Sequence, residues 1–322
     1  MRIVPAFLLL MVAGLIAPGF GATFAAPPQP QTFSIVAADP AAGEAGVAVA
    51  SRFFAVGTVV PHARAGVGAV ATQSFANTSY GPRGLDLLER GLSPEEVVGV
   101  LTRDDDNRKQ RQVGVVDATG KSATFSGSAC LEWAGGRHGE DYAVQGNILT
   151  AEEVVVAMER AFLENSGRPL AERLYAALVA GDEAGGDSRG KQSAAILVVR
   201  DKAGYGGFTD RAVDIRVDDH AEPMKEIGRL LDLALVNDYW NRGWNAFKEG
   251  RMEEALIWQE RTAERAGSAA SMLPGVLYDL AVIRLANKDE SGARKALARA
   301  VELEPKLERQ AKTDNDLASI ND

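Results

Sequence analysis

The sequence predicts an α+β protein in which one layered domain is followed by a small all-α region. Up to about residue 222, predicted strands come first and last, and predicted helices are grouped between them. This order is typical of an α+β domain and not of alternating βαβ units. Beyond Pro223 the pattern is helical and repeats. We therefore expect an α+β domain over 32–222 and a helical region over 223–322, preceded by a targeting segment.

Composition and charge exclude one class of partner. The 322 residues are 46% hydrophobic and 25% charged, as in an ordinary globular protein. The formal net charge is −9 and the isoelectric point is near 5.1, so no basic stripe is available to displace counterions from a phosphate backbone. We expect no nucleic-acid partner.

The first 31 residues predict export. A charged start precedes an apolar run over Ala6–Ile16, which has the length of a signal-peptide core and is too short to span a bilayer. Small residues favour cleavage after Gly21 or Ala25, which gives a signal peptide over 1–25 and a proline-rich spacer over 26–31. We expect a periplasmic or secreted protein with no membrane association after the signal is removed.

A β-hairpin over Thr32–Arg52 is the first folded element that we predict. Its first strand alternates apolar residues with smaller or polar ones, a turn follows over 39–43, and the second strand is apolar over Val47–Ala50. If the chain is cut before Thr32, this residue carries a nucleophilic hydroxyl and a free α-amine. The amine has an ordinary pKa of about 7.7–8.0, so its neutral fraction can accept the hydroxyl proton. The alternative is a β-branched residue that simply begins a strand.

The remaining elements follow from periodicity, caps and turns. Apolar runs flanked by glycine or turn residues predict strands, and apolar residues on one face predict helices. Ser93-Pro94 followed by Glu96 predicts a capped helix start, and Gly127–Gly139 predicts a glycine-rich loop. The predicted strands are 66–73, 112–117, 122–126, 142–147, 192–199 and 214–220, and the predicted helices are 84–90, 93–103, 151–165 and 170–180.

Two groups of polar residues interrupt this pattern. Gln73 and Asn77 follow a strand of small residues, where a substrate could approach closely or where a loop satisfies its own backbone. Asp187 and Arg189 lie on a glycine-rich turn that leads into a core strand. One interpretation is that the turn holds a charged group at the strand end. The other is that the two residues form a solvated ion pair on the surface.

Metal, cofactor and disulfide chemistry have no support in the sequence. His62, His138 and His220 show no ligand spacing, so we expect no metal site. No glycine-rich segment opens a helix as a phosphate loop does, so we expect no nucleotide cofactor. Cys130 is the only cysteine, which excludes an internal disulfide.

The helical region resembles the tetratricopeptide repeat. Gly243 and Ala255 are twelve residues apart with a glycine turn between them, and Ala281 and Ala293 repeat the interval. The copies are offset by 38 residues, compared with about 34 in the motif. Two repeats are fewer than a free-standing array needs, so we expect them to lean on the main domain. Their surface is a candidate site for a protein partner or for self-association.

Seven segments in order span the chain from Thr32 to about Leu231. They are TFSIVAADP at 32–40, GVAVASRFFAVG at 46–57, GVGAVATQ at 66–73, YGPRGLDLL at 80–88, RQVGVVD at 111–117, QGNIL at 145–149 and AGGDSRGKQSAA at 184–195. Together they resemble family 1028 of the domains of unknown function, which is assigned to the N-terminal nucleophile hydrolase superfamily. The resemblance implies a four-layer αββα sandwich, with Thr32 as the nucleophile and amide hydrolysis through an acyl-enzyme.

This resemblance suggests roles for the polar residues in hydrolysis of a small amide. Asn77 and Asn147, or backbone N–H groups, would stabilise the oxyanion. Asp187 would orient the amine, and Arg189 would bind a substrate carboxylate through two hydrogen bonds. Gln73 and Arg52 are further substrate-binding candidates; Arg52 ends the hairpin strand that pairs with the strand of Thr32.

The sequence departs from the family pattern at the position before the threonine. Cytosolic relatives commonly carry methionine directly before it, whereas cleavage after Ala25 leaves six residues ahead of Thr32. Either a second cut exposes Thr32 or the amine stays blocked. In the latter case the protein is a non-catalytic exported binding module that uses the sandwich as a scaffold and the helical tail as a partner surface.

Overall fold

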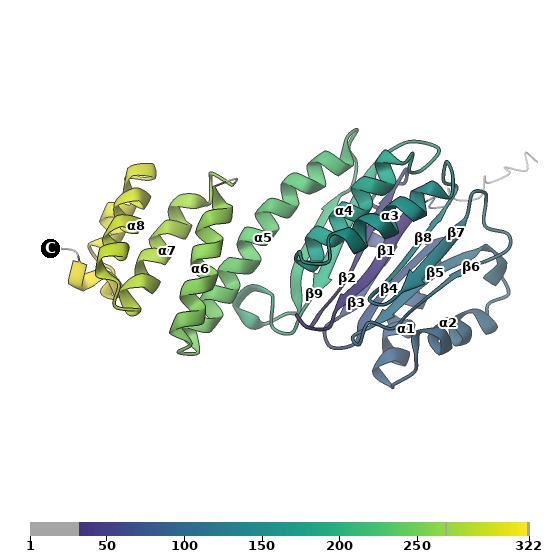
Figure 1. The fold of residues 1–322 in the computed structure, drawn as a ribbon, viewed down its shortest axis with the longest axis horizontal. Helices are drawn as coiled ribbons and strands as arrows, with labels where there is room; N and C mark the ends of the chain where they lie inside the picture. The colour runs from purple at the N-terminus through teal and green to yellow at the C-terminus, as the bar shows by residue number, and fades with distance from the viewer. Residues whose placement is uncertain (1–31, 268, 321–322) are drawn as a thin grey trace, which may run out of the picture.

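The computed structural model describes residues 32–267 and 269–320. The predicted signal peptide, its cleavage sites and the spacer over 26–31 therefore lie outside the described residues. The chain forms a mixed α/β unit with two antiparallel sheets, and a series of helices continues from it (Figure 1). No helix in the described ranges is long and apolar enough to cross a membrane.

The larger sheet has six strands in the order β10-β9-β2-β1-β8-β7, and the smaller has four in the order β3-β4-β5-β6. Every pairing within them is antiparallel. The predicted hairpin is confirmed as β1 and β2, which pair from Thr32 opposite Ser51 to Asp39 opposite Glu44. The strands are β1 Thr32–Asp39, β2 Glu44–Ser51, β3 Pro61–Arg64, β4 Gly68–Ser74, β5 Arg111–Asp117, β6 Ser122–Ser126, β7 Gly135–Gly139, β8 Tyr142–Asn147, β9 Ser193–Val199 and β10 Arg211–Val217.

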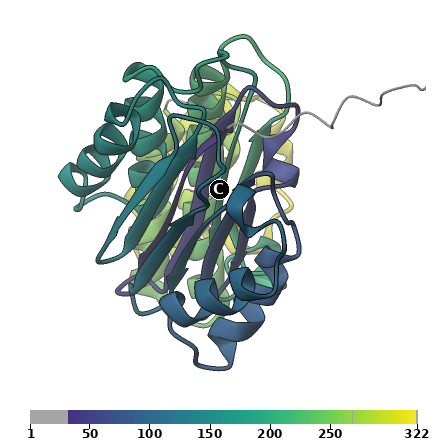
Figure 2. The ribbon, with the colours of Figure 1, turned by 90° about the vertical axis from the view of Figure 1, so that its right-hand side faces the viewer.

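Helix pairs cover the outer faces of the two sheets. Helices α3 (Glu153–Glu164) and α4 (Leu170–Glu183) lie on the six-stranded sheet, and α1 (Tyr80–Glu89) and α2 (Pro94–Arg103) lie on the four-stranded one. Figure 2 shows the two pairs on opposite sides of the strands. The predicted capping box of α2 is confirmed, because Ser93 Oγ accepts from the Glu96 N–H and the Ser93 N–H donates to Glu96 Oε2.

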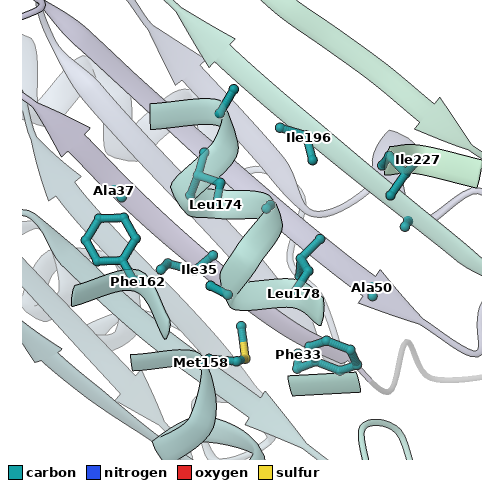
Figure 3. Close-up of a cluster of buried hydrophobic side chains, with 14 of the residues drawn as sticks. Phe33, Ile35, Ala37, Ala50, Met158, Phe162, Leu174, Leu178, Ile196 and Ile227 are labelled. Carbon is teal, nitrogen blue, oxygen red and sulfur yellow. The ribbon is translucent and has the colours of Figure 1, made fainter. Parts of the chain in front are cut away.

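Strand β1 has two buried faces of different chemistry. Phe33, Ile35 and Ala37 point toward α3 and α4 and join the largest apolar cluster (Figure 3). Burying each large side chain of this cluster contributes about 1.5–3 kcal/mol. The alternate residues of β1 face the second sheet, where Val36 and Ala38 join a separate apolar cluster. Because side chains alternate along a strand, Thr32 and Ser34 also point between the sheets.

The helical region begins on the larger sheet and then leaves it. Helix α5 (Pro223–Lys248) packs its first half into the cluster of α3 and α4 through Ile227 and Leu231, and its second half contacts α6. Successive helices then pack against one another and form a separate apolar cluster. They are α6 Met252–Ala266, α7 Leu273–Ala286, α8 Glu290–Leu303 and the short α9 Leu307–Ala311.

The structure corrects three local predictions. The closing strand, expected over 214–220, is β10 at Arg211–Val217. The glycine-rich segment 127–139 was expected to be a loop, but Gly135–Gly139 form strand β7 at the sheet edge, paired with β8. A Cβ atom on Gly136 would lie 2.8 Å from Thr124 Oγ1 and 2.9 Å from the Val144 oxygen, so only glycine fits there. Helix α1 begins at Tyr80 instead of Gly84, because the buried Tyr80 side chain packs into the apolar cluster of α1 and α2.

Candidate functional site

Four buried polar side chains form a row across the end of the larger sheet. Thr32 opens β1 and lies directly opposite Asn147 on β8 and Ser51 on β2, and Ser51 in turn lies opposite Ser193 on β9. Directly opposed residues of antiparallel strands point to the same face, so all four face the second sheet. None is more than 2% exposed. A polar row at this depth needs partners for every donor and acceptor.

Thr32 is held by its neighbours on both strands. Its Oγ1 hydroxyl donates to Ser51 Oγ at 3.3 Å. Its carbonyl oxygen accepts from Gln73 Nε2 of the opposite sheet at 3.2 Å. The side chain of Ser193 secures the far end of the row, where its hydroxyl donates to the Phe53 oxygen and accepts from the Val56 N–H. The hydroxyl of Thr32 therefore has a defined position between two sheets.

Three buried glutamines connect this row to the second sheet. Gln73 Nε2 donates to Gln112 Oε1 at 2.7 Å, and Asn147 Nδ2 donates to the same oxygen at 3.0 Å. Ser34 Oγ donates to Gln73 Oε1 at 2.6 Å and accepts from Gln145 Nε2 at 2.7 Å. An unpaired amide in such an interior would cost about 1–3 kcal/mol, so these bonds fix the relative position of the sheets.

A glycine makes room for one of these amides. Gly114 lies on β5, and a Cβ atom built there would be 2.2 Å from Gln145 Oε1. No side chain larger than hydrogen fits without moving Gln145. The interior of the sandwich is therefore shaped around the polar network at this point.

Asp187 lies beside the end of β2 and is fully engaged. Its Oδ2 accepts from the Arg52 backbone N–H at 2.8 Å and from Arg189 Nη2 at 2.9 Å. Its Oδ1 accepts from the Arg189 N–H and from Arg189 Nε. The Asp187 side chain is only 2% exposed, whereas that of Arg189 is 31% exposed. Of the two sequence-based readings, the geometry is therefore that of a charged group held at a strand end.

The predicted arginines are placed differently from one another. Arg189 pairs with Asp187, next to Ser51 and hence close to Thr32 along the sheet end. Arg52 contributes its backbone N–H to Asp187, and among the described residues its exposed guanidinium donates to the Lys191 oxygen at 3.4 Å. Of the two predicted arginines, only Arg189 thus pairs its side chain with Asp187.

Asn77 belongs to a second polar cluster, which does not include Thr32. Its Nδ2 donates to Asp105 Oδ2 at 3.2 Å, and the same oxygen accepts from Tyr80 and Arg111. The hydrogen bond from Arg111 holds the pKa of Asp105 well below its usual value. Burial raises the pKa of Tyr80. Asn77 thus stabilises the connection between β4 and α1, which is the loop alternative from the sequence.

A small cavity borders Ser51 and Ser193 of the polar row. It has a volume of about 50 Å³ and is lined by residues including Ser51, Asp187, Ser193 and Phe33. A water molecule occupies about 30 Å³ in the liquid, whereas ligand pockets usually measure about 300–1,000 Å³. This cavity therefore has room for one water and none for an amide substrate, and neither Thr32 nor Asn147 lines it.

Sequence reasoning missed Ser193, Gln112 and Gln145 as members of this site. A usable signal was present, because each lies in a predicted buried strand, where a polar side chain requires a partner. The three glutamines in particular occur in runs of small or apolar residues on three different strands. Within 32–267 and 269–320, no group of three histidine, cysteine, aspartate or glutamate side chains is arranged to hold a metal ion.

Comparison with known proteins places these strands in a family. The model of the family of unknown function DUF1028 matches residues 32–227. The crystal structure of protein SPO2555 from Silicibacter pomeroyi, which matches the same family model, is 32% identical to this chain, with a TM-score of 0.58. The similarity covers 63% of this chain and 89% of that one. None of the curated proteins matches. The family match thus includes the whole polar row and ends within the first turns of α5.

Proposed function

The chain belongs to DUF1028, a family of unknown function, and we propose that it is an exported amidohydrolase whose nucleophile is Thr32. The observation that best supports the proposal is the buried row of Asn147, Thr32, Ser51 and Ser193 at the end of the larger sheet. We propose that the two sheets and their helix pairs correspond to the sandwich of N-terminal nucleophile hydrolases, in which the first residue of the first strand reacts.

The proposed reaction requires a cut directly before Thr32. While residue 31 is attached, the Thr32 nitrogen is an amide and cannot act as a base. After the cut, the α-amine accepts the hydroxyl proton as Oγ1 bonds to the amide carbonyl carbon of the substrate. The C–N bond then breaks, and the amine leaves with that proton. Water hydrolyses the resulting ester, which releases the acid and restores the Thr32 hydroxyl.

The neighbours of Thr32 have distinct proposed roles. Asn147 lies opposite Thr32 and would donate its amide N–H to the oxyanion, together with backbone N–H groups. Ser51 Oγ accepts a hydrogen bond from the Thr32 hydroxyl and would orient that hydroxyl for the reaction. Arg189, held by Asp187, would bind an acidic group of the substrate. Because Thr32 is fully buried in the described conformation, the strand end must open before a substrate reaches it.

The test begins with the N-terminus. Protein purified from the export compartment is sequenced, and a mature chain beginning at Thr32 is expected. Chains beginning at Thr32 and at Ala26 are then compared on a panel of small N-acyl and cyclic amides. Only the first should be active, because only it has a free amine on the nucleophilic residue. Equal activity of both chains would contradict the proposed mechanism.

Substitutions of Thr32 test the nucleophile itself. In the chain that begins at residue 32, Thr32→Ser keeps the hydroxyl and should retain activity, whereas Thr32→Ala and Thr32→Val should lose roughly a thousandfold or more. Thr32→Val keeps the branched shape, so it controls for packing. Loss of the bond to Ser51 should cost only about 1 kcal/mol, so all variants should remain folded in a thermal melt. Unchanged turnover by Thr32→Ala would refute the assignment.

The helical region supports a second proposal about architecture. We infer that α5 and α6 pack like a tetratricopeptide pair, because a Cβ atom on Gly243 of α5 would lie 2.8 Å from Gln259 Oε1 of α6. Small residues at this crossing allow the close approach that the repeat requires. A groove between β10 and α5, which is described below, favours a partner-binding role for this region.

A further inference from the structure

A large groove lies at the junction of the larger sheet and the helical region, away from Thr32. It has a volume of about 1010 Å³ and is lined by strand β10, by the short 3-10 turn Tyr205–Gly207 with Phe208, and by one face of α5. Figure 1 shows α5 running from the sheet to the helices that follow, which places this face along the junction. Its volume is at the upper end of the usual range for ligand sites.

One wall of the groove is an open strand edge. Strand β10 is the last strand of the six-stranded sheet, and β9 is its only partner in the part of the chain that the structure describes. The groove is lined by the consecutive residues from Arg211 to Ile215, so it follows the strand and not just one of its faces. The outer N–H and C=O groups of such an edge can pair with a further extended segment.

The opposite wall carries a ladder of three asparagines. Asn237, Asn241 and Asn245 all line the groove and are spaced four residues apart on α5. Four residues rise about 6 Å along a helix, and two residues of an extended chain rise about 6.4–6.8 Å. Within the described ranges, none of the three side-chain amides makes a hydrogen bond. The ladder can therefore bond successive peptide groups on one side of an extended chain.

Aromatic rings complete the groove. Trp240 and Trp244 lie between the asparagines, and both indole N–H groups donate to Asp279 Oδ2, at 2.7 and 2.9 Å. One carboxylate thus fixes both rings before any ligand binds. Tyr205 and Phe208 are 88% and 89% exposed, which is unusual for large aromatic side chains. These four rings provide apolar contacts for side chains of a bound segment.

The charge of the groove differs from that of the whole protein. The chain has a formal net charge of −9, yet the charged residues that line the groove are Arg211, Lys248 and one acid, Asp214. Lys248 makes no ion pair with any residue in the described ranges, and it ends the asparagine face of α5. A ligand with an acidic group near that end would be electrostatically complementary.

We propose that this groove binds an extended peptide segment of another protein, with apolar side chains and an acidic residue. The peptide adds to the free edge of β10, the asparagine ladder bonds its other backbone edge, and its acidic residue pairs with Lys248. The proposal is independent of hydrolysis at Thr32, because no residue of the polar row lines the groove.

The probe is a displayed library of random octapeptides, selected on the full chain. Selected sequences should alternate apolar residues and contain an acid. A synthetic selected peptide should change the tryptophan fluorescence and bind the Asn241→Ala/Asn245→Ala double variant about thirtyfold more weakly. Alanine favours the helix more than asparagine does, so α5 should remain intact. Lys225→Ala, an exposed change elsewhere on α5, is the matched control and should bind like the wild type.

A second peptide tests pairing with the strand. Replacing alternate residues of the selected peptide by proline removes the N–H donors that β10 would accept, so binding should be lost. Chitohexaose is tested in parallel, because tryptophan and asparagine also suit sugars. The proposal is overturned if no peptide is enriched, if the double variant binds the peptide like the wild type, or if only chitohexaose binds at this groove.

Discussion

A cluster of four charges joins the sheet to the helical region, and it is the contact whose removal we expect to matter most for stability. Asp238 of α5 is 3% exposed and accepts from Arg200 at 2.7 Å and from Arg242 at 2.8 Å. Both arginines also donate to Glu44 Oε1, each at 2.6 Å. Glu44 begins β2 and Arg200 follows β9, so the cluster connects two strand ends to α5. The perturbation that we consider is Asp238→Ala.

The expected loss of stability follows from the two arginines that Asp238→Ala leaves with a single carboxylate. Two guanidinium groups would share the single Glu44 carboxylate in a site where their side chains are 15% and 22% exposed. Removing one partner of a buried pair costs about 3–5 kcal/mol, and partial access of water to both arginines favours the lower end. We expect the free energy of unfolding to fall by about 3 kcal/mol. The melting temperature should fall by roughly 6–12 °C.

Thermal melts and denaturant titrations of the full chain measure this effect. Asp232→Ala is the matched control, because Asp232 lies on the same helix and pairs with Arg265 but is 50% exposed. Such an exposed pair should contribute at most about 1 kcal/mol. The loss in Asp238→Ala should persist at about 1 M salt, because buried pairs are screened little. Equal effects of the two substitutions would refute the argument that burial makes this cluster important.

Two further predictions concern pH and truncation. Because Arg111 holds the pKa of Asp105 below its usual value, the stability from this pair should be complete above about pH 4 and decrease as the pH falls further. Asp105→Asn should therefore lose less stability in acid than the wild type, as followed by circular dichroism, and parallel acid curves would contradict this. Deletion of 238–322 should leave a folded but less soluble domain with a lower melting temperature than deletion of 249–322, because only the former removes Asp238 and Arg242; identical melts would exclude a role for the cluster.

Local rules predicted the elements that obey them. The first hairpin was predictable because apolar residues alternate up to a turn over 39–43, and the start of α2 because Ser93 and Glu96 can cap each other. Such signals lie within a few residues of one another. They do not depend on which other segment the element meets in the folded chain.

Contacts between segments that are distant in the sequence are not predicted by such local rules. Strand β7 has no apolar alternation, and only its pairing with β8 and the close approach of Thr124 at Gly136 explain it. Asn77 was expected, together with Asn147, to stabilise the oxyanion formed at Thr32. Its amide is instead bound by Asp105, 28 residues later in the chain, through a contact that no spacing rule predicts. The glutamine network likewise joins residues from four strands.

The location of Thr32 bears on whether a cut before it could produce a working site. A new chain terminus usually frays, which would leave the amine without a fixed position. Thr32, however, pairs with Ser51 on one side and Asn147 on the other, and Gln73 holds its carbonyl oxygen from the opposite sheet. Loss of the preceding residue removes none of these contacts. We therefore expect the amine formed by a cut to remain between β2 and β8. The buried polar network around Thr32 would hold the amine in that position.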